Sequence, residues 1–164
     1  MRPWRARQFL LLILALASGV LSANAPESLH ALSLPRIDQA RGERVSLSDY
    51  AGRTLLVLLF EDECHYCLQA LQVADARVHA EPDRYAMVAV GVGASARALN
   101  AWAQRVHPHA PVLQATGPLL AALGGVRATP LLLIVDASGK VRLRELGSFK
   151  ENDLDAWLLA SAAR

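Results

Sequence analysis

Short runs of apolar residues recur along the chain between turn residues, and this pattern indicates buried β-strands. The clearest run spans residues 54–60, where six of seven side chains are apolar, as in a strand covered on both faces. A shorter run predicts a strand at 44–47, and the remaining runs predict strands at 85–92, 131–135 and 141–146. The turn Ala-Ser-Gly-Lys at 137–140 joins the last two, so these strands should pair as an antiparallel hairpin.

Between these strands, apolar residues recur every three or four positions, which is the spacing of amphipathic helices. The longest such helix should cover residues 64–79 and end before Pro82. Its inward face should hold Cys67, Leu71, Ala74 and Val78. This helix therefore begins directly after a buried strand and carries both cysteines of the chain in its first turn.

Three further helices are expected from capping residues and from glycines at helix ends. Ser95 should cap one helix, a short helix should fill 116–123 before two glycines, and Ser148 with Glu151 has the capping-box pattern of a last helix. Residues 26–43 look irregular. The resulting order, strand-helix-strand-helix-helix-strand-strand-helix, predicts an α/β fold with a mixed central sheet and helices on both faces.

The first 25 residues differ from the rest and have the features of a secretory signal peptide. A basic start is followed by an apolar run at 9–21 and by the small residues Ala23-Asn24-Ala25 before Pro26. The apolar run is shorter than the roughly 20 residues that a membrane-spanning helix needs. We expect residues 1–25 to be a signal peptide or a retained N-terminal anchor, and residues 26–164 to form one domain in the bacterial periplasm.

The charge of the chain changes when this leader is set aside. The leader holds three of the 17 basic residues and none of the 15 acidic ones, so the expected domain carries 14 basic and 15 acidic residues. No cluster of Lys and Arg with interleaved aromatic residues remains in it. We therefore expect no nucleic-acid partner.

The two cysteines, Cys64 and Cys67, are spaced for redox chemistry rather than for stapling the fold. A cross-link that closes so short a loop adds little stability, whereas an exported protein can keep the disulfide oxidised. Cys64 should lie at a helix N-terminus, where unpaired backbone N–H groups and the helix dipole favour a thiolate, so it is the expected nucleophile. Cys67, one turn further and facing inward, can resolve a mixed disulfide with a bound substrate.

The residues around the cysteines should have opposite effects on the stability of a Cys64 thiolate. His65 can donate a hydrogen bond to a Cys64 thiolate and make the disulfide more oxidising, or it is only a solvated loop histidine. Glu61, Asp62 and Glu63 place negative charge beside the site, and like charge disfavours a thiolate. One of these acids could shuttle the proton of Cys67, or all three are solvated loop charges. The sequence leaves both alternatives open.

Several ordered motifs accompany the cysteines. They are Val-Ser-Leu-Ser-Asp-Tyr-Ala-Gly at 45–52, Gly-Gly-Val-Arg-Ala-Thr-Pro at 124–130, Asp-Ala-Ser-Gly-Lys at 136–140, and Gly147. With these motifs, residues 32–160 resemble the thioredoxin superfamily and, within it, the periplasmic TlpA-like thiol-disulfide oxidoreductases. The long stretch between Cys67 and Pro130 is similar to the extra strand-helix insertion of that branch.

The resemblance implies a thioredoxin-like fold and assigns further site residues. Thr129-Pro130 is implied to be a cis peptide that faces the redox disulfide, with the Thr129 backbone pairing to an extended substrate, and Tyr66 is implied to contact the substrate as well. The implied partners are a protein thiol or disulfide and a separate redox partner, such as a membrane protein, that resets the pair. We expect a monomer that needs no metal or organic cofactor.

Three departures from the family leave the direction of electron flow open. Glu63 stands where relatives usually have Trp, the residues between the cysteines lack the usual Pro, and no acid lies between Leu68 and Ala74. These differences weaken the case for a cytochrome c maturation reductase. Reductase, oxidase and isomerase directions therefore stay open.

A peroxidase, a metal carrier and a binding scaffold are the alternatives to thiol-disulfide exchange. A peroxiredoxin-type peroxidase needs a Pro and a Thr or Ser upstream of its cysteine, and residues 56–63 contain none of these. A metal carrier would combine the cysteines with His107 and His109, although their separation is longer than compact zinc modules use. A non-catalytic binding scaffold with a permanent disulfide is the remaining alternative.

Overall fold

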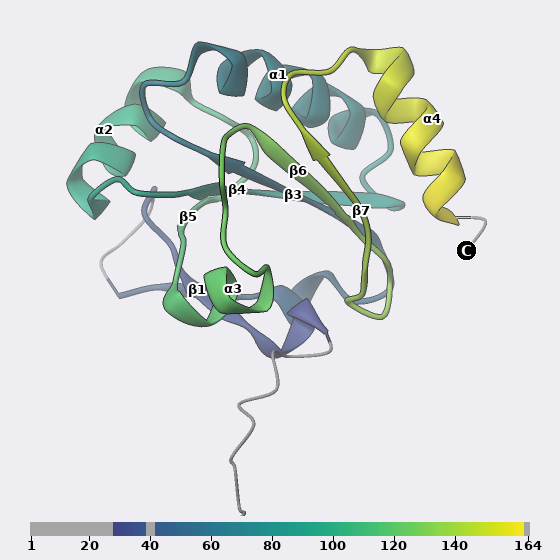
Figure 1. Ribbon diagram of the computed structural model, residues 1–164, viewed down its shortest axis with the longest axis horizontal. Helices are drawn as coiled ribbons and strands as arrows, with labels where there is room; N and C mark the ends of the chain where they lie inside the picture. Colours follow the sequence, from purple (N-terminus) through teal and green to yellow (C-terminus); the bar gives the residue numbers. More distant parts are fainter. Residues whose placement is uncertain (1–27, 39–41, 163–164) are drawn as a thin grey trace, which may run out of the picture.

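A five-stranded mixed sheet forms the centre of the computed structural model, which describes residues 28–38 and 42–162 (Figure 1). Its strands are β3 (Thr54–Phe60), β4 (Tyr85–Gly91), β5 (Val112–Gln114), β6 (Leu131–Val135) and β7 (Val141–Leu146), in the spatial order β5-β4-β3-β6-β7. β3, β4 and β5 are parallel neighbours, whereas β6 is antiparallel to both β3 and β7. The predicted mixed sheet and antiparallel hairpin are thus confirmed.

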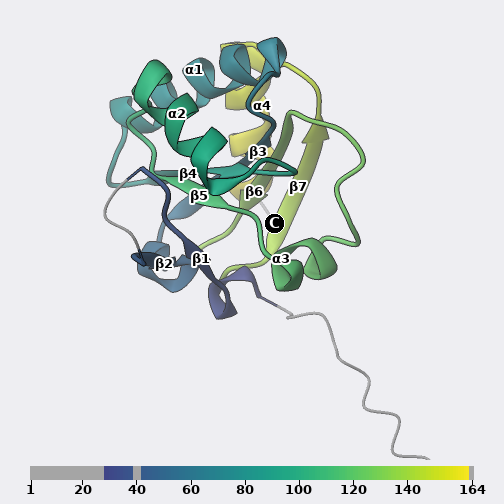
Figure 2. The same ribbon diagram turned by 90° about the vertical axis from the view of Figure 1, so that its left-hand side faces the viewer.

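Helices cover both faces of this sheet, as predicted (Figures 1 and 2). One face carries α1 (His65–Ala80), α2 (Ala96–Val106) and α4 (Glu151–Ala162). The opposite face carries α3 (Gly117–Ala122), two short 3-10 helices (Leu29–Ala31 and Leu47–Tyr50) and the small pair β1 (Ser33–Pro35) and β2 (Arg44–Ser46). None of the described helices is long and apolar enough to cross a membrane.

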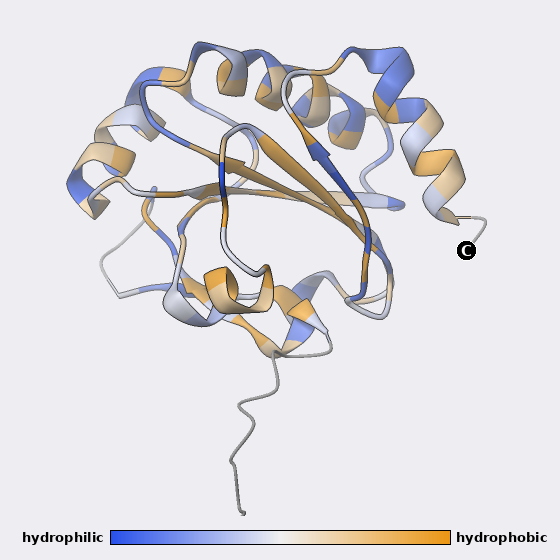
Figure 3. Ribbon diagram, viewed as in Figure 1, coloured by the Kyte–Doolittle hydropathy of each residue, from blue (hydrophilic) through white to orange (hydrophobic). Residues whose placement is uncertain are grey.

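The central strand β3 explains why one sheet supports two cores. Its alternate residues Leu56, Leu58 and Phe60 pack under α1 and α2, while Leu55, Val57 and Leu59 pack against the opposite layer. All six are at most 1% exposed, and burying each side chain contributes about 1.5–3 kcal/mol. In Figure 3 the central strands are coloured as hydrophobic, whereas the edge strand β7 is more hydrophilic.

The helix ends confirm one predicted cap and correct another. Ser95 caps α2, where its side chain accepts a hydrogen bond from the N–H of Ala98. The predicted capping box of Ser148 and Glu151 is wrong, because α4 begins only at Glu151. Its cap instead uses Asp153, whose carboxylate accepts the N–H of Lys150 at 3.0 Å.

Two short strands were not predicted. The stretch at 26–43 was expected to be irregular, but β1 within it pairs antiparallel with β2, which fulfils the prediction of a strand at 44–47. β5 was missed because it is only three residues long; it pairs with β4 and forms an isolated antiparallel bridge between Leu113 and Arg36. The predicted leader at 1–25 lies outside the described residues.

The turn between β6 and β7 is built around Asp136 and holds the start of the described chain. The Asp136 carboxylate accepts hydrogen bonds from the N–H and hydroxyl of Ser138, from the N–H of Lys140 and from Nε of Arg142. The N–H of Leu29 donates to the carbonyl of Gly139 at 2.8 Å. The first 3-10 helix is therefore fastened to the hairpin turn.

Candidate active site at the Cys64–Cys67 disulfide

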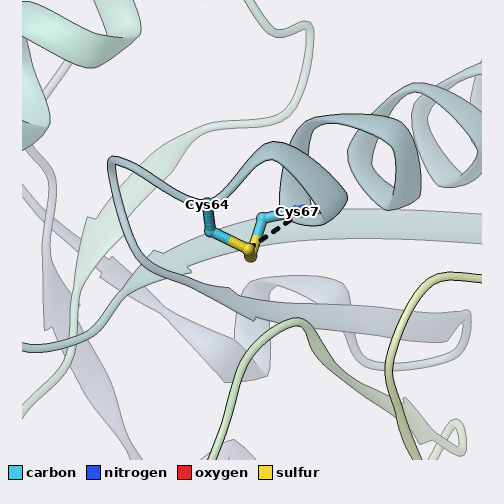
Figure 4. Close-up of a disulfide and its surroundings, with 2 residues drawn as sticks. All are labelled: Cys64 and Cys67. Atoms are coloured by element: carbon cyan, nitrogen blue, oxygen red, sulfur yellow. Dashed lines mark hydrogen bonds between the residues drawn. A yellow bond between two sulfur atoms is a disulfide. The ribbon is translucent and has the colours of Figure 1, made fainter.

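The two cysteines form a disulfide at the point where β3 gives way to α1 (Figure 4). β3 ends at Phe60, and a turn closed by the N–H of Cys64 and the carbonyl of Glu61 leads into the helix. Cys64 is the N-cap of α1, and its Sγ accepts a hydrogen bond from the N–H of Cys67 at 3.1 Å. The predicted position of Cys64 at a helix N-terminus is therefore confirmed.

The two sulfurs have different surroundings. Cys67 is 1% exposed and belongs to the core beneath α1, whose members include Leu58, Phe60 and Leu71. No acidic or basic residue among those that the structure describes is buried. Cys64 is half-buried, so the pair joins one partly exposed cysteine to one enclosed cysteine.

The residues between the cysteines lie on the outer side of the helix. Tyr66 is 62% exposed, which is unusual for a large aromatic side chain, and its ring lies edge-on to that of His65. The His65 ring is also exposed, and its Nε2 lies 3.3 Å from Nε2 of Gln69. Within the described part of the chain, no hydrogen bond joins the imidazole to either sulfur of the disulfide.

The acidic residues before Cys64 lie in the turn itself. Glu61 and Glu63 are exposed, and Asp62 is half-buried. Their side chains form no hydrogen bond or ion pair with other described residues. That one of these acids shuttles the proton of Cys67 stays a prediction.

Thr129 and Pro130 lie at the same end of the central strands as the cysteines. β3 and β6 run antiparallel with Leu59 opposite Leu131, so the residue before Leu131 flanks the end of β3. The Thr129-Pro130 peptide is cis, as the resemblance implies. In the view of Figure 4, the segment that enters β6 runs below the disulfide.

The end of β7 completes this end of the sheet, and the sequence motifs pointed only to Gly147 within it. The carbonyl of Pro130 accepts the N–H of Gly147 at 2.8 Å, and the preceding Leu146 lies opposite Leu131 and is 62% exposed. Gln69 was also missed, although its spacing of four residues from His65 is the signal for a contact on one helix face.

The metal alternative is not supported by the geometry. Among the described residues, no group of three or more His, Cys, Asp or Glu side chains is placed to hold a metal ion. His109 bonds to Asp75 through its N–H and its Nδ1, and its ring stacks on that of His79. Because Asp75 is about 12 Å along α1 from Cys67, these histidines do not join the cysteines in one site.

Two cavities of about 690 and 620 Å³ also lie away from the disulfide. The first lies between β1 and the start of α2, with Arg36 and Arg97 in its lining, and the second lies between α1 and the end of α2, with His79 and His107. Neither is lined by Cys64 or Cys67. The disulfide therefore lies outside both cavities.

Comparison with known proteins agrees with this arrangement. Residues 25–158 match the family model described as Redoxin, whereas no curated protein sequence matches the chain. Among solved structures, a putative thiol:disulfide interchange protein DsbE from Chlorobium tepidum is 22% identical, with a TM-score of 0.68 over 79% of this chain and 92% of that chain.

Two further solved structures are similar over comparable lengths. A secreted disulfide oxidoreductase from Mycobacterium tuberculosis is 16% identical, with a TM-score of 0.66 over 83% of this chain and 99% of that chain. The exposed lipoprotein thioredoxin Etrx1 from Streptococcus pneumoniae is 26% identical, with a TM-score of 0.67 over 81% of this chain and 98% of that chain. Because the family model spans most of the sequence and the active-site disulfide is present, the chain belongs to the Redoxin family of the thioredoxin superfamily and is a thiol-disulfide oxidoreductase.

Proposed function

We propose that this protein works in the periplasm, where it exchanges the Cys64–Cys67 disulfide or dithiol with cysteines of protein substrates. The observation that carries the proposal is the asymmetry of the pair, with Cys64 accessible at the N-terminus of α1 and Cys67 enclosed in the core. An accessible first sulfur can be attacked by a substrate, and an enclosed second sulfur is shielded from other thiols.

The exchange balances in both directions. In reduction of a substrate, the Cys64 thiolate attacks the substrate disulfide, and one substrate sulfur leaves as a thiolate. Cys67 then loses its proton and attacks Sγ of Cys64, which forms the protein disulfide and releases the second substrate thiolate. In oxidation of a substrate, the same steps run in reverse, and two electrons pass from the substrate dithiol to the protein.

The neighbouring residues receive roles that fit their positions. The Thr129 backbone would pair with an extended substrate segment, Pro130 would orient that segment, and the exposed Tyr66 ring would pack against it. His65 would stabilise the thiolate of Cys64 in the reduced protein. A surface disulfide outside the two described cavities suits a protein chain better than an enclosed small molecule.

The proposed location is supported by the leader and by two relatives. The expected signal or anchor at 1–25 would export the domain, and similar proteins are a secreted oxidoreductase and an exposed lipoprotein. In the periplasm, a membrane redox partner would reset the pair. We infer that the domain acts as a monomer.

The deciding experiment is equilibration of residues 26–164 with glutathione redox buffers, followed by trapping and counting of the free thiols. A reduction potential of about −120 mV marks an oxidant and one of about −270 mV marks a reductant. Exchange with a denatured protein dithiol or disulfide should be far faster than in buffer alone. A pair that neither oxidises nor reduces would overturn the proposal in favour of a binding scaffold.

A further inference from the structure

The imidazole of His65 lies beside the side-chain amide of Gln69. His65 is the first residue of α1 and Gln69 is one turn further on, so both side chains lie on the same helix face. Their Nε2 atoms are 3.3 Å apart, whereas the described hydrogen bond to Sγ of Cys64 comes from the backbone of Cys67. In the oxidised protein, the ring is therefore engaged with an amide rather than with sulfur.

This contact competes with the role proposed for His65. The amide donates to Nε2 of a neutral imidazole, or accepts from Nε2 if the amide is turned and Nε2 carries the proton. A Cys64 thiolate in the reduced protein is a new and charged acceptor for a ring N–H. To donate to that thiolate through Nε2, the ring must give up its contact with Gln69.

We propose that Gln69 is a positioning residue that holds the His65 imidazole on the outer face of α1 in the oxidised protein and thereby stabilises the disulfide relative to the dithiol. The inference rests on the proposed exchange function and adds a residue to it. Gln69 itself touches neither sulfur in the described hydrogen bonds, so it acts only through His65.

Reduction of the disulfide by a substrate releases the ring. A substrate dithiol gives two electrons to the Cys64–Cys67 bond and becomes a disulfide. Of the two substrate protons, one is taken by Cys67 as its S–H, and the other goes to the His65 ring or to water, while Cys64 stays a thiolate. Helix contacts between exposed side chains four residues apart are weak, so we expect Gln69 to change the exchange equilibrium about twofold.

A double-mutant cycle of His65 and Gln69 tests the coupling. The equilibrium with glutathione is measured for the wild type, Gln69→Ala, His65→Ala and the double variant. Gln69→Ala should shift the equilibrium about twofold toward the dithiol, which is about 9 mV in reduction potential, and should have no effect when His65 is absent. Gln72→Ala is the matched control, because it removes another exposed glutamine of α1.

A second measurement separates this inference from the proposed function. The ¹⁵N NMR shifts of the His65 ring in the oxidised protein report which nitrogen carries the proton and whether it is hydrogen-bonded. They should change in Gln69→Ala and not in Gln72→Ala. Unchanged His65 shifts, or an equal effect of Gln69→Ala on the potential with and without His65, would overturn the inference even if exchange itself proceeds. An inert disulfide would overturn the proposed function instead, while the NMR shifts would still test the contact.

Discussion

The sulfur of Cys64 is itself the N-cap of α1, because it accepts the backbone N–H of Cys67 at 3.1 Å. An N-cap usually carries a side-chain oxygen, and serine is among the preferred residues there. The capping atom of this helix is therefore also the atom that must react. Substitution by serine preserves the cap and removes the reactive thiol.

The asymmetry of the two sulfurs predicts that Cys67→Ser traps substrates. With the resolving thiol gone, a substrate attached to Cys64 stays bound as a mixed disulfide, because nothing inside the protein can attack Sγ of Cys64. Non-reducing electrophoresis and mass spectrometry after mixing with a protein disulfide should show the adduct.

Cys64→Ser is the matched control for this trap and should give no adduct, since Cys67 is 1% exposed. Equal trapping by both variants would mean that Cys67 is as accessible as Cys64 in solution, and the assigned order of attack would be wrong.

Replacement of His65 should lower the reduction potential. If the imidazole stabilises the Cys64 thiolate, His65→Ala loses that stabilisation only in the reduced form, by about 30 mV if one hydrogen bond of about 1.4 kcal/mol is lost. Glutathione equilibration measures the shift. His79→Ala is a suitable control, because His79 is an exposed histidine near the far end of the same helix. An unchanged potential in His65→Ala would show that the ring is only solvated.

Asp136 should make stability depend on acid pH. Partial burial by itself raises the pKa of the Asp136 carboxyl, but hydrogen bonds from Ser138, Lys140 and Arg142 outweigh this and hold the pKa well below its ordinary value. A carboxylate whose pKa is depressed by folding stabilises the native state above its unfolded pKa of about 3.9, and this contribution is lost as the pH falls through the folded pKa.

Asp136→Asn should therefore reduce the free energy of unfolding at pH 7 by about 1–3 kcal/mol. The difference between the two proteins should shrink as the pH falls below about 5. Urea unfolding at several pH values measures both effects, and Asp83→Asn, at an exposed turn position, provides the reference. A difference that stays constant from pH 7 to pH 3 would contradict the assigned ionic role.

Gly139 should be the least replaceable of two glycines with the same backbone angle. Gly139 and Gly52 both have φ of +87°, but a Cβ at Gly139 would lie 2.1 Å from Oγ of Ser28 and 2.6 Å from the His30 ring, whereas nothing lies within 4 Å at Gly52. Both alanine variants lose about 1–2 kcal/mol from the left-handed backbone. Gly139→Ala should lose about 1–3 kcal/mol more by displacing the first 3-10 helix.

Thermal unfolding and limited proteolysis near Ser28 check this difference. Earlier cleavage in Gly139→Ala than in Gly52→Ala is the expected result. Equal stability and equal cleavage of the two variants would show that the first 3-10 helix does not depend on the hairpin turn.

The long buried elements could be predicted from the sequence, because burial on both faces of β3 demands six apolar residues in a row. The helix of the cysteines could be placed for the same reason, from the spacing of its inward face. β5 could not, since three residues carry no usable periodicity and their strand depends on pairing with β4 and on the bridge to Arg36, which are both distant in sequence. The start of α4 was misplaced because Ser148 and Glu151 have the spacing of a capping box, whereas the fold uses Asp153, which accepts the N–H of Lys150.

The site also contains residues that the sequence could predict and residues that it could not. Cys64, Cys67 and the Thr129-Pro130 edge could be anticipated from spacing and from the resemblance. The exposure of Leu146 and the turn of His65 toward Gln69 could not, because they depend on where β7 ends and on which rotamer a surface ring adopts. The exposure of Leu146 depends on tertiary packing, and the contact between His65 and Gln69 depends on weak polar interactions at the surface of α1.

The hydrogen bond from Leu29 to Gly139 also places the start of the described chain at one end of the sheet. The hairpin turn and Pro130 lie at opposite ends of the five-residue strand β6, about 15 Å apart. The chain thus enters the domain at the pole opposite the disulfide. A segment or tag joined ahead of Ser28 would therefore leave the domain on the side away from the reactive sulfur and would not stand between Cys64 and a substrate.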